Sequence, residues 1–228
     1  MSETRFMTFP VALLKDAFTD IKKVCNNAMK YAIYSKAQSV GVAESFKFFG
    51  VSYAKAENYE SAYQSGKVLY DSFEGSASPM VSVNKDILFQ FIQQPKTEFE
   101  IAVFCAFCAV RSIIGKKQYA KTNNNFVLAR LLGYRSFDEF EISGGADSAY
   151  YQKYFSTDKK LRNNLTDKII KYSLVLGWGL NYYSGRNRGF YISFELPAKD
   201  LKLLAEKTTW AYKQKEYQKK QAKSLMSK

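Results

Sequence analysis

The stretch NYYSGRNRGFYISFEL, residues 181–196, carries the clearest local signal in the chain. Two runs rich in tyrosine and phenylalanine flank a short turn that holds two glycines and two arginines. Aromatic runs on either side of a glycine turn are typical of a β-hairpin, and Pro197 would end its second strand. Alternating side chains let one face of the hairpin pack while the tip stays exposed. We therefore predict a hairpin over residues 178–196 with Arg186 and Arg188 at its tip.

The segment before the hairpin has the pattern of a basic helix, from about residue 158 to residue 174. Leucine, isoleucine and tyrosine recur near one stripe at helical spacing, and Ser156 or Thr157 can cap the helix. We expect this stripe to pack on the helix predicted at residues 98–114. The other faces are polar and mostly basic: Lys159, Lys160, Arg162, Asn163, Asn164, Thr166, Lys168 and Lys171.

Residues 98–114 give the strongest helix signal. Thr97 and Glu100 have the spacing of a capping box, and Gly115 stands where a glycine often ends a helix. The helix is apolar nearly all round, so we expect it to be the central buried helix. Cys105 and Cys108 resemble half of a metal site, but the chain has no histidine and no second cysteine pair, so we expect them to pack in the core.

A basic segment without acidic residues runs from Arg111 to Arg135 and includes a short helix at about 126–134. Lys121 and Asn124 lie just before or at the start of that helix, whose N-terminal amides could hold a phosphate. The asparagine run at 123–125 is equally consistent with a loop that only caps the helix.

The first part of the chain is predicted to be helical at about 16–37, 42–49, 57–73 and 82–94. We therefore expect a mainly α fold with a small β-hairpin, in the α+β class. Its predicted parts are a helical N-terminal module (1–80), a domain at 81–196 and a basic helical tail (197–228).

Composition limits the function. The 228 residues include no histidine and three cysteines, which removes histidine-based catalysis, the usual histidine-containing zinc sites and a disulfide framework. No apolar run is long enough to span a bilayer, and the N-terminus lacks the pattern of a signal peptide. We expect a cytoplasmic protein with no membrane contact, no cofactor and no metal.

The charge is unevenly distributed. Residues 1–110 hold 11 Lys/Arg and 11 Asp/Glu, whereas residues 111–228 hold 23 Lys/Arg and 10 Asp/Glu, so the second part carries the whole net charge of +13. This concentration indicates a surface for a polyanion, with nucleic acid favoured over a membrane surface. The neutral N-terminal half is a candidate for homodimer or partner contacts.

The order of buried helix, short helix, basic helix and hairpin over residues 98–196 resembles the winged helix-turn-helix DNA-binding proteins. The resemblance implies that the helix at 158–174 enters the major groove of double-stranded DNA, with the hairpin as the wing beside it. The segment between Gly133 and Asp158 is longer than the usual tight turn, so an extra helix or a wrapped loop is expected there. The opening RFMTFPVALLKDAF resembles the start of plasmid and phage replication initiators, which suggests an initiator or a transcriptional regulator of a mobile element.

Each candidate residue is assigned to a type of DNA contact. Lysines suit phosphates, whereas arginine and asparagine present paired donors to base edges, and arginines at a hairpin tip suit a narrow minor groove. The predicted contacts are Arg162, Asn163 and Thr166 with bases, Lys159, Lys160 and Lys168 with phosphates, Arg186 and Arg188 with the minor groove, and Lys121 and Asn124 with a further phosphate.

Two other functions fit parts of the sequence. A structural protein could use the same fold to bind a protein, with its basic tail on an acidic partner. A metal-dependent nuclease could use Asp147 with the Asp158-x-Lys160 motif, although Asp158 is expected at the start of a helix, where it favours the helix dipole.

Overall fold

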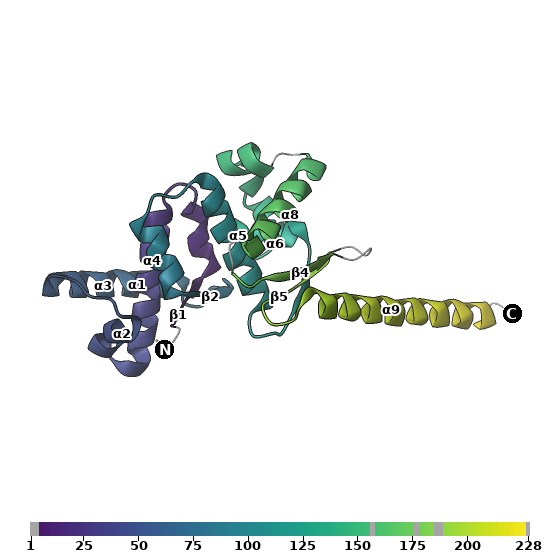
Figure 1. Cartoon of the computed structure of the whole chain (residues 1–228), viewed down its shortest axis with the longest axis horizontal. Helices are drawn as coiled ribbons and strands as arrows, with labels where there is room; N and C mark the ends of the chain where they lie inside the picture. The colour runs from purple at the N-terminus through teal and green to yellow at the C-terminus, as the bar shows by residue number, and fades with distance from the viewer. Residues whose placement is uncertain (1–4, 156–157, 176–177, 185–188, 227–228) are drawn as a thin grey trace.

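The computed structural model describes residues 5–155, 158–175, 178–184 and 189–226, and it confirms a mainly α fold with small antiparallel sheets (Figure 1). The helices are η1 (Val11–Asp16), α1 (Ile21–Val40), α2 (Val42–Phe49), α3 (Ala56–Phe73), α4 (Lys85–Gln93), α5 (Glu98–Ile114), α6 (Asn124–Leu131), α7 (Phe137–Ile142), η2 (Gly145–Asp147), η3 (Tyr151–Phe155), α8 (Lys159–Val175) and α9 (Ala198–Met226). The strands are β1 (Phe6–Pro10), β2 (Met80–Asn84), β3 (Ala120–Thr122), β4 (Asn181–Ser184) and β5 (Phe190–Ser193).

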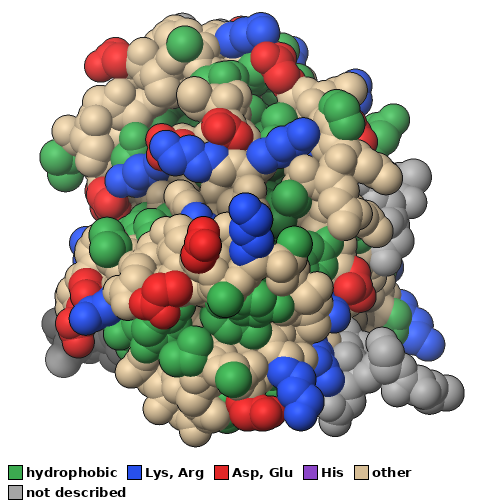
Figure 2. Space-filling model, turned by 90° about the vertical axis from the view of Figure 1, so that its left-hand side faces the viewer, with side chains coloured by type: hydrophobic (Ala, Val, Ile, Leu, Met, Phe, Trp, Pro, Cys, Tyr) green, Lys and Arg blue, Asp and Glu red, His purple; other side chains and the backbone are tan. Residues whose placement is uncertain are grey.

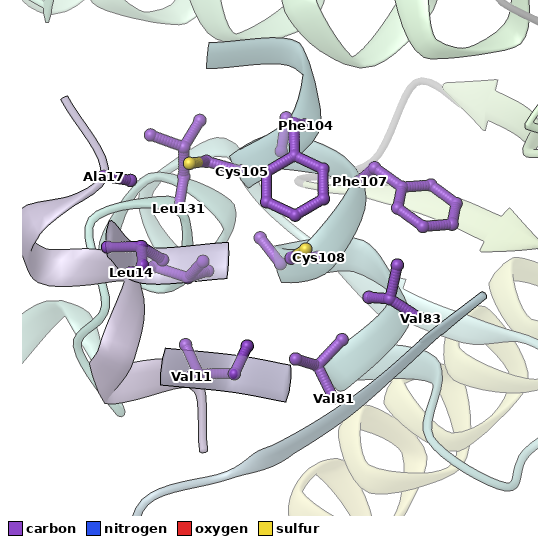
Figure 3. Close-up of a cluster of buried hydrophobic side chains, with 14 of the residues drawn as sticks. Val11, Leu14, Ala17, Val81, Val83, Phe104, Cys105, Phe107, Cys108 and Leu131 are labelled. Atoms are coloured by element: carbon purple, nitrogen blue, oxygen red, sulfur yellow. The ribbon is translucent and has the colours of Figure 1, made fainter. Parts of the chain in front are cut away.

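Helix α5 is the central buried helix, as predicted. The Thr97 amide donates to the Glu100 carboxylate at 2.8 Å, and the Glu100 amide donates to the Thr97 hydroxyl at 3.3 Å, so the capping box is complete. Side chains of α5 pack between η1, β2 and α6, with Cys105 and Cys108 inside this cluster (Figure 3). The two cysteines are therefore part of the core, as expected.

The N-terminal half contains a two-stranded sheet that the sequence pattern did not predict. Strands β1 and β2 pair antiparallel, with Met7 opposite Val83 and Phe9 opposite Val81, and these four side chains are buried. The predicted helix at 82–94 is therefore too long at its start, because Met80–Asn84 is a strand. The Asn84 side chain caps α4, since its oxygen accepts a hydrogen bond from the Asp86 amide at 2.8 Å.

Helix α1 packs against α2, α3, α4 and β1 and forms the centre of the N-terminal half. Its contact with α3 is close at Gly66, where an added Cβ would overlap the backbone carbonyl of Lys30. The glycine is therefore required by the approach of two backbones rather than by an unusual φ.

The predicted hairpin is present and belongs to a three-stranded sheet in the order β3-β5-β4. The first strand is shorter than expected and begins at Asn181. Strand β3 is an additional edge strand, with Lys121 opposite Tyr191 and Thr122 opposite Phe190. The sequence does not predict this strand, because three residues are too few to give an alternating pattern.

Both faces of strand β5 are covered, although the sequence pattern predicted only one packed face. Phe190 and Ile192 face the main core, whereas Tyr191 packs against Leu201 and Ala205 in the first turns of α9. The N-terminal end of α9 therefore acts as a second layer over the sheet.

The long segment between α6 and α8 folds back on the core as α7, η2 and η3. Phe140 and Phe155 are fully buried, and the Tyr150 hydroxyl donates to the carbonyl of Phe18. The expected extra helix is therefore present, and it leaves α8 packed against α5 and α6.

Helix α9 leaves the body of the molecule after its first turns and projects away from it (Figure 1). Its 29 residues correspond to a length of about 43 Å. Among the described residues, no helix is long and apolar enough to cross a membrane.

Candidate nucleic-acid interface

A cleft of about 850 Å³ lies where the starts of α6 and α7, one side of α8 and the hairpin meet. Most of its lining is polar: Asn123, Asn124, Asn125, Phe126, Ser136, Phe137, Asp138, Lys159, Asn163, Asp167, Ser184, Gly189 and Phe190. The cleft therefore brings residues of the predicted basic helix and of the hairpin to one place.

The N-terminal half of α8 supplies one wall of the cleft. The Asp158 carboxylate caps the helix by accepting hydrogen bonds from the amides of Lys160 at 2.8 Å and Leu161 at 3.2 Å. This cap fixes the first turn, and Lys159 and Asn163, one helical turn apart, both line the cleft. Asp158 lies at the start of the helix, as predicted, and it also caps the helix, whereas the predicted caps Ser156 and Thr157 lie outside the described residues.

The hairpin supplies the facing wall. Ser184 at the end of β4 and Gly189 just before β5 line the same cleft as Lys159 and Asn163. Gly189 has a φ of 100° and lies against the Thr122 backbone, so a side chain there would be strained and would clash with β3. Arg186 and Arg188, the two predicted minor-groove contacts, lie outside the described residues.

Three other predicted phosphate ligands are exposed but do not line the cleft. Lys160 and Lys168 lie on the exposed surface of α8. Lys121 lies on β3, with its ammonium 5.7 Å from the centre of the Tyr191 ring. Lys121 is thus on the opposite side of the hairpin from α8, where it lines a second groove.

Two of the three predicted base contacts are used within the protein instead. Thr166 is fully buried, and its hydroxyl donates to the carbonyl of Arg162 at 2.9 Å, so it does not face solvent. The Arg162 guanidinium donates to the Tyr151 hydroxyl at 3.0 Å and lies 5.5 Å from the centre of the Phe137 ring. Arg162 thus connects α8 to η3 and α7, whereas the Thr166 hydrogen bond stays within α8. Asn163 is the predicted base contact that lines the cleft.

Asn124 links the start of α6 to α8. Its side-chain nitrogen is 3.5 Å from the carbonyl of Asn163, whereas the neighbouring Asn123 caps α6 by accepting from the Phe126 amide at 2.9 Å. The capping role is thus confirmed for Asn123, whereas phosphate binding at the start of α6 stays a prediction, with all three asparagines lining the cleft.

Two residues that line the cleft, Asn124 and Asp167, carry a buried side-chain atom without a hydrogen-bond partner. Within the described residues the side-chain atoms of this kind are Thr122 Oγ1, Asn124 Oδ1, Arg162 Nε and Asp167 Oδ1. Native proteins leave few such atoms unpaired, and they tend to do so where a ligand or water completes the pairing. All four belong to β3, α6 and α8, the elements that surround the hairpin.

Asp167 is an acidic residue in a cleft whose described lining includes a single basic residue, Lys159. Burial raises the pKa of its carboxyl, and the Lys171 charge and the Asn124 side chain partly oppose that rise. Asp138, at the start of α7, is a second carboxylate in the cleft. Neither was singled out from the sequence. The Ser136-x-x-Glu139 spacing could have located this edge, since Ser136 caps α7 by accepting from the Glu139 amide at 3.1 Å.

The far end of the molecule has a different surface. Figure 2 looks at the side formed by the N-terminal half and shows basic and acidic side chains interspersed with apolar ones. Exposed apolar side chains of this half include Val40, Val42 and Val68. The even mixture of signs agrees with the zero net charge of residues 1–110.

No family model, curated protein or solved structure matches the chain at a significant level. Within the described residues, no group of three or more cysteine, aspartate and glutamate side chains could hold a metal ion. The function of the cleft is therefore inferred from its own residues.

Proposed function

We propose that the chain is a double-stranded DNA-binding protein of the winged-helix type, with α8 as the helix that enters the major groove and the β4–β5 hairpin as the wing. The observation that carries the proposal is the cleft in which the N-terminal half of α8 and both flanks of the hairpin turn meet. Because α8 and the hairpin border one concave surface, both can contact a phosphate backbone that lies in the cleft.

The order of elements supports this proposal. Strand β3 follows α5 and pairs with β5, so α5, β3, α6, α8 and the hairpin form one continuous unit. A helix that packs on two others and lies beside a hairpin resembles the winged helix in arrangement as well as in order. The extra segment α7–η3 packs beside α8 and leaves Lys159 and Asn163 at the cleft.

The proposal gives separate roles to separate residues. Lys159, Lys160 and Lys168 contact phosphates, which supplies affinity that does not depend on sequence. Asn163 has the paired donor and acceptor that match the edge of adenine in the major groove. Arg162 is a positioning residue, because it connects α8 to η3, and the buried Thr166 has no role in DNA contact.

Duplex binding is tested by titrating a labelled random-sequence duplex at several salt concentrations. Neutralising about 6–8 phosphates gives a log–log salt slope of about −5 to −7. The double variant Lys159→Ala/Lys160→Ala should weaken binding and make the slope shallower by about 2, since each lysine accounts for about one unit.

The matched control is Lys55→Ala/Lys67→Ala, which removes the same charge from exposed positions in the α3 region at the other end of the molecule (Figure 1). Equal weakening by the two double variants would show a non-specific charge effect and would overturn the assignment of α8. Selection of bound fragments from a random pool gives the target sequence, and Asn163→Ala should relax one base position by about 1–3 kcal/mol.

A further inference from the structure

A second groove of about 570 Å³ lies on the other side of the hairpin, between the sheet and α9. Its lining includes Lys121, Tyr183, Tyr191, Lys202, Trp210 and Lys213. Gly189 lines this groove and the α8 cleft alike, so the two sites are neighbours.

The groove combines positive charge with aromatic rings. Its three lysines come from two walls, with Lys121 on β3 and the other two on α9, and a single carboxylate, Glu206, accompanies them. Glu206 lies 4.0 Å from Lys202, and both side chains are more than half exposed. An exposed ion pair of this length is weak, so Lys202 stays available to an anion.

Trp210 is the unusual residue of this groove. Its side chain is 64% exposed, although tryptophan is normally among the more buried residues. It lines the groove from α9, whereas Tyr183 and Tyr191 line the groove from the sheet. A solvent-exposed ring beside lysines provides a flat surface for a nucleobase and cations for its phosphate. Grooves of this kind bind single-stranded nucleic acid, because unpaired bases expose their faces for stacking.

We propose that this groove binds a short single-stranded stretch of nucleic acid, with a base stacked on Trp210 and the phosphates beside Lys121, Lys202 and Lys213. A duplex offers no unpaired base face to Trp210, so the groove selects single strands over duplexes. The site is distinct from the α8 cleft, and its occupancy does not require duplex binding.

The test measures binding of labelled dT20 and rU20 by anisotropy, with the intact chain. Stacking on one aromatic ring makes Trp210→Ala roughly 5- to 150-fold weaker for single strands. The matched control is Tyr217→Ala, which removes another exposed aromatic ring of α9 that does not line the groove. We expect this control to bind within about twofold of the unaltered chain, since it changes no stacking contact. The dT20 and rU20 arms show whether the groove takes DNA or RNA.

A second measurement reports stacking directly. The chain has two tryptophans, so Trp178→Phe leaves Trp210 as the sole tryptophan. We expect its fluorescence to be quenched on addition of dT20. Lys202→Ala/Lys213→Ala should make the salt slope for dT20 shallower by about 1.4, at roughly 0.7 per phosphate contact on single strands. Lys207→Ala, on the same helix outside the groove, should leave the slope unchanged.

The outcomes separate the two proposals. Lys159→Ala/Lys160→Ala should weaken duplex binding and leave dT20 binding intact. If dT20 does not bind, or if Trp210→Ala and Tyr217→Ala behave alike, the groove proposal is wrong whatever the duplex result. If Trp210→Ala weakens duplex and dT20 equally, the groove does not select single strands and the proposal is also wrong.

Discussion

At the scale of single residues, the side chains of α8 are divided between positioning and exposure. Arg162 and Thr166 point into the protein, whereas Lys159 and Asn163 line the cleft, although all four are polar and close in sequence. The difference depends on η3 and α7, which supply the Tyr151 hydroxyl and the Phe137 ring for Arg162. Local sequence could not assign these roles, because the partners lie in a segment without a clear pattern.

Replacing Asp167 is expected to change both the stability of the chain and its affinity for duplex DNA. Burial raises the pKa of its carboxyl above the ordinary value of 3.8, so the ionised form is less stable in the folded chain than in the unfolded chain. Asp167→Asn should therefore raise the melting temperature at pH 7. Removing a negative charge from the cleft should also tighten duplex binding by roughly three- to tenfold.

The pH dependence of this gain has a definite sign. A group whose pKa is raised by folding is unfavourable above its folded pKa and neutral in both states below the unfolded value. The advantage of Asp167→Asn should therefore shrink as the pH falls through the folded pKa towards 3.8. Melting curves of the unaltered chain and of Asp167→Asn between pH 3 and pH 8 measure this difference in stability. An advantage that does not change with pH would contradict the role given to this carboxyl.

At the scale of elements, the main helices and the β4–β5 hairpin could be predicted from the sequence, whereas β1, β2 and β3 could not. The capping box of α5 and the apolar periodicity of α8 are local signals, and both helices lie where the sequence placed them. Strand β3 has three residues and is defined by pairing with Phe190–Ile192, about seventy positions later. Strand β2 likewise depends on β1, so the signal for either strand is not contained in its own sequence.

The close packing of α1 against α3 is expected to exclude a larger residue at position 66. Gly66→Ala raises helix propensity, yet the new Cβ would overlap the Lys30 carbonyl. The two helices must move apart, so we expect a net loss of about 1–3 kcal/mol in the free energy of unfolding. Urea denaturation measures it, with Ser61→Ala on the exposed side of α3 as the control. A stabilised Gly66→Ala variant would show that this contact is looser than described.

At the scale of the whole molecule, α9 has a packed beginning and a projecting remainder. Leu201 and Ala205, in its first turns, are buried with Tyr191 on the outer face of the sheet. Figure 1 shows the rest of the helix extending away from the body. The beginning therefore supports the fold, whereas the remainder projects away from it.

Two truncations test this division. A chain that ends at Lys213 should melt within about 2 °C of the full chain, because the packed turns remain. A chain that ends at Pro197 exposes Tyr191 and should lose about 1.5–3 kcal/mol of stability. Thermal melts followed by circular dichroism distinguish the two. Equal melting temperatures for both truncated chains would show that α9 does not stabilise the sheet.

The position of α5 has a consequence for the molecule as a whole. It packs on η1 and β2 on one side and on α6 and α8 on the other, so the two halves share one interior (Figure 3). Any ligand at the cleft opposes global unfolding, and at a hundred times its Kd it adds about 2.7 kcal/mol. Because unfolding either half would expose the buried surface of α5, this added stability protects α1 and its neighbours as much as α8. Amide hydrogen exchange in the N-terminal helices would thus slow on addition of DNA, although the proposed binding cleft lies at the other end of the molecule.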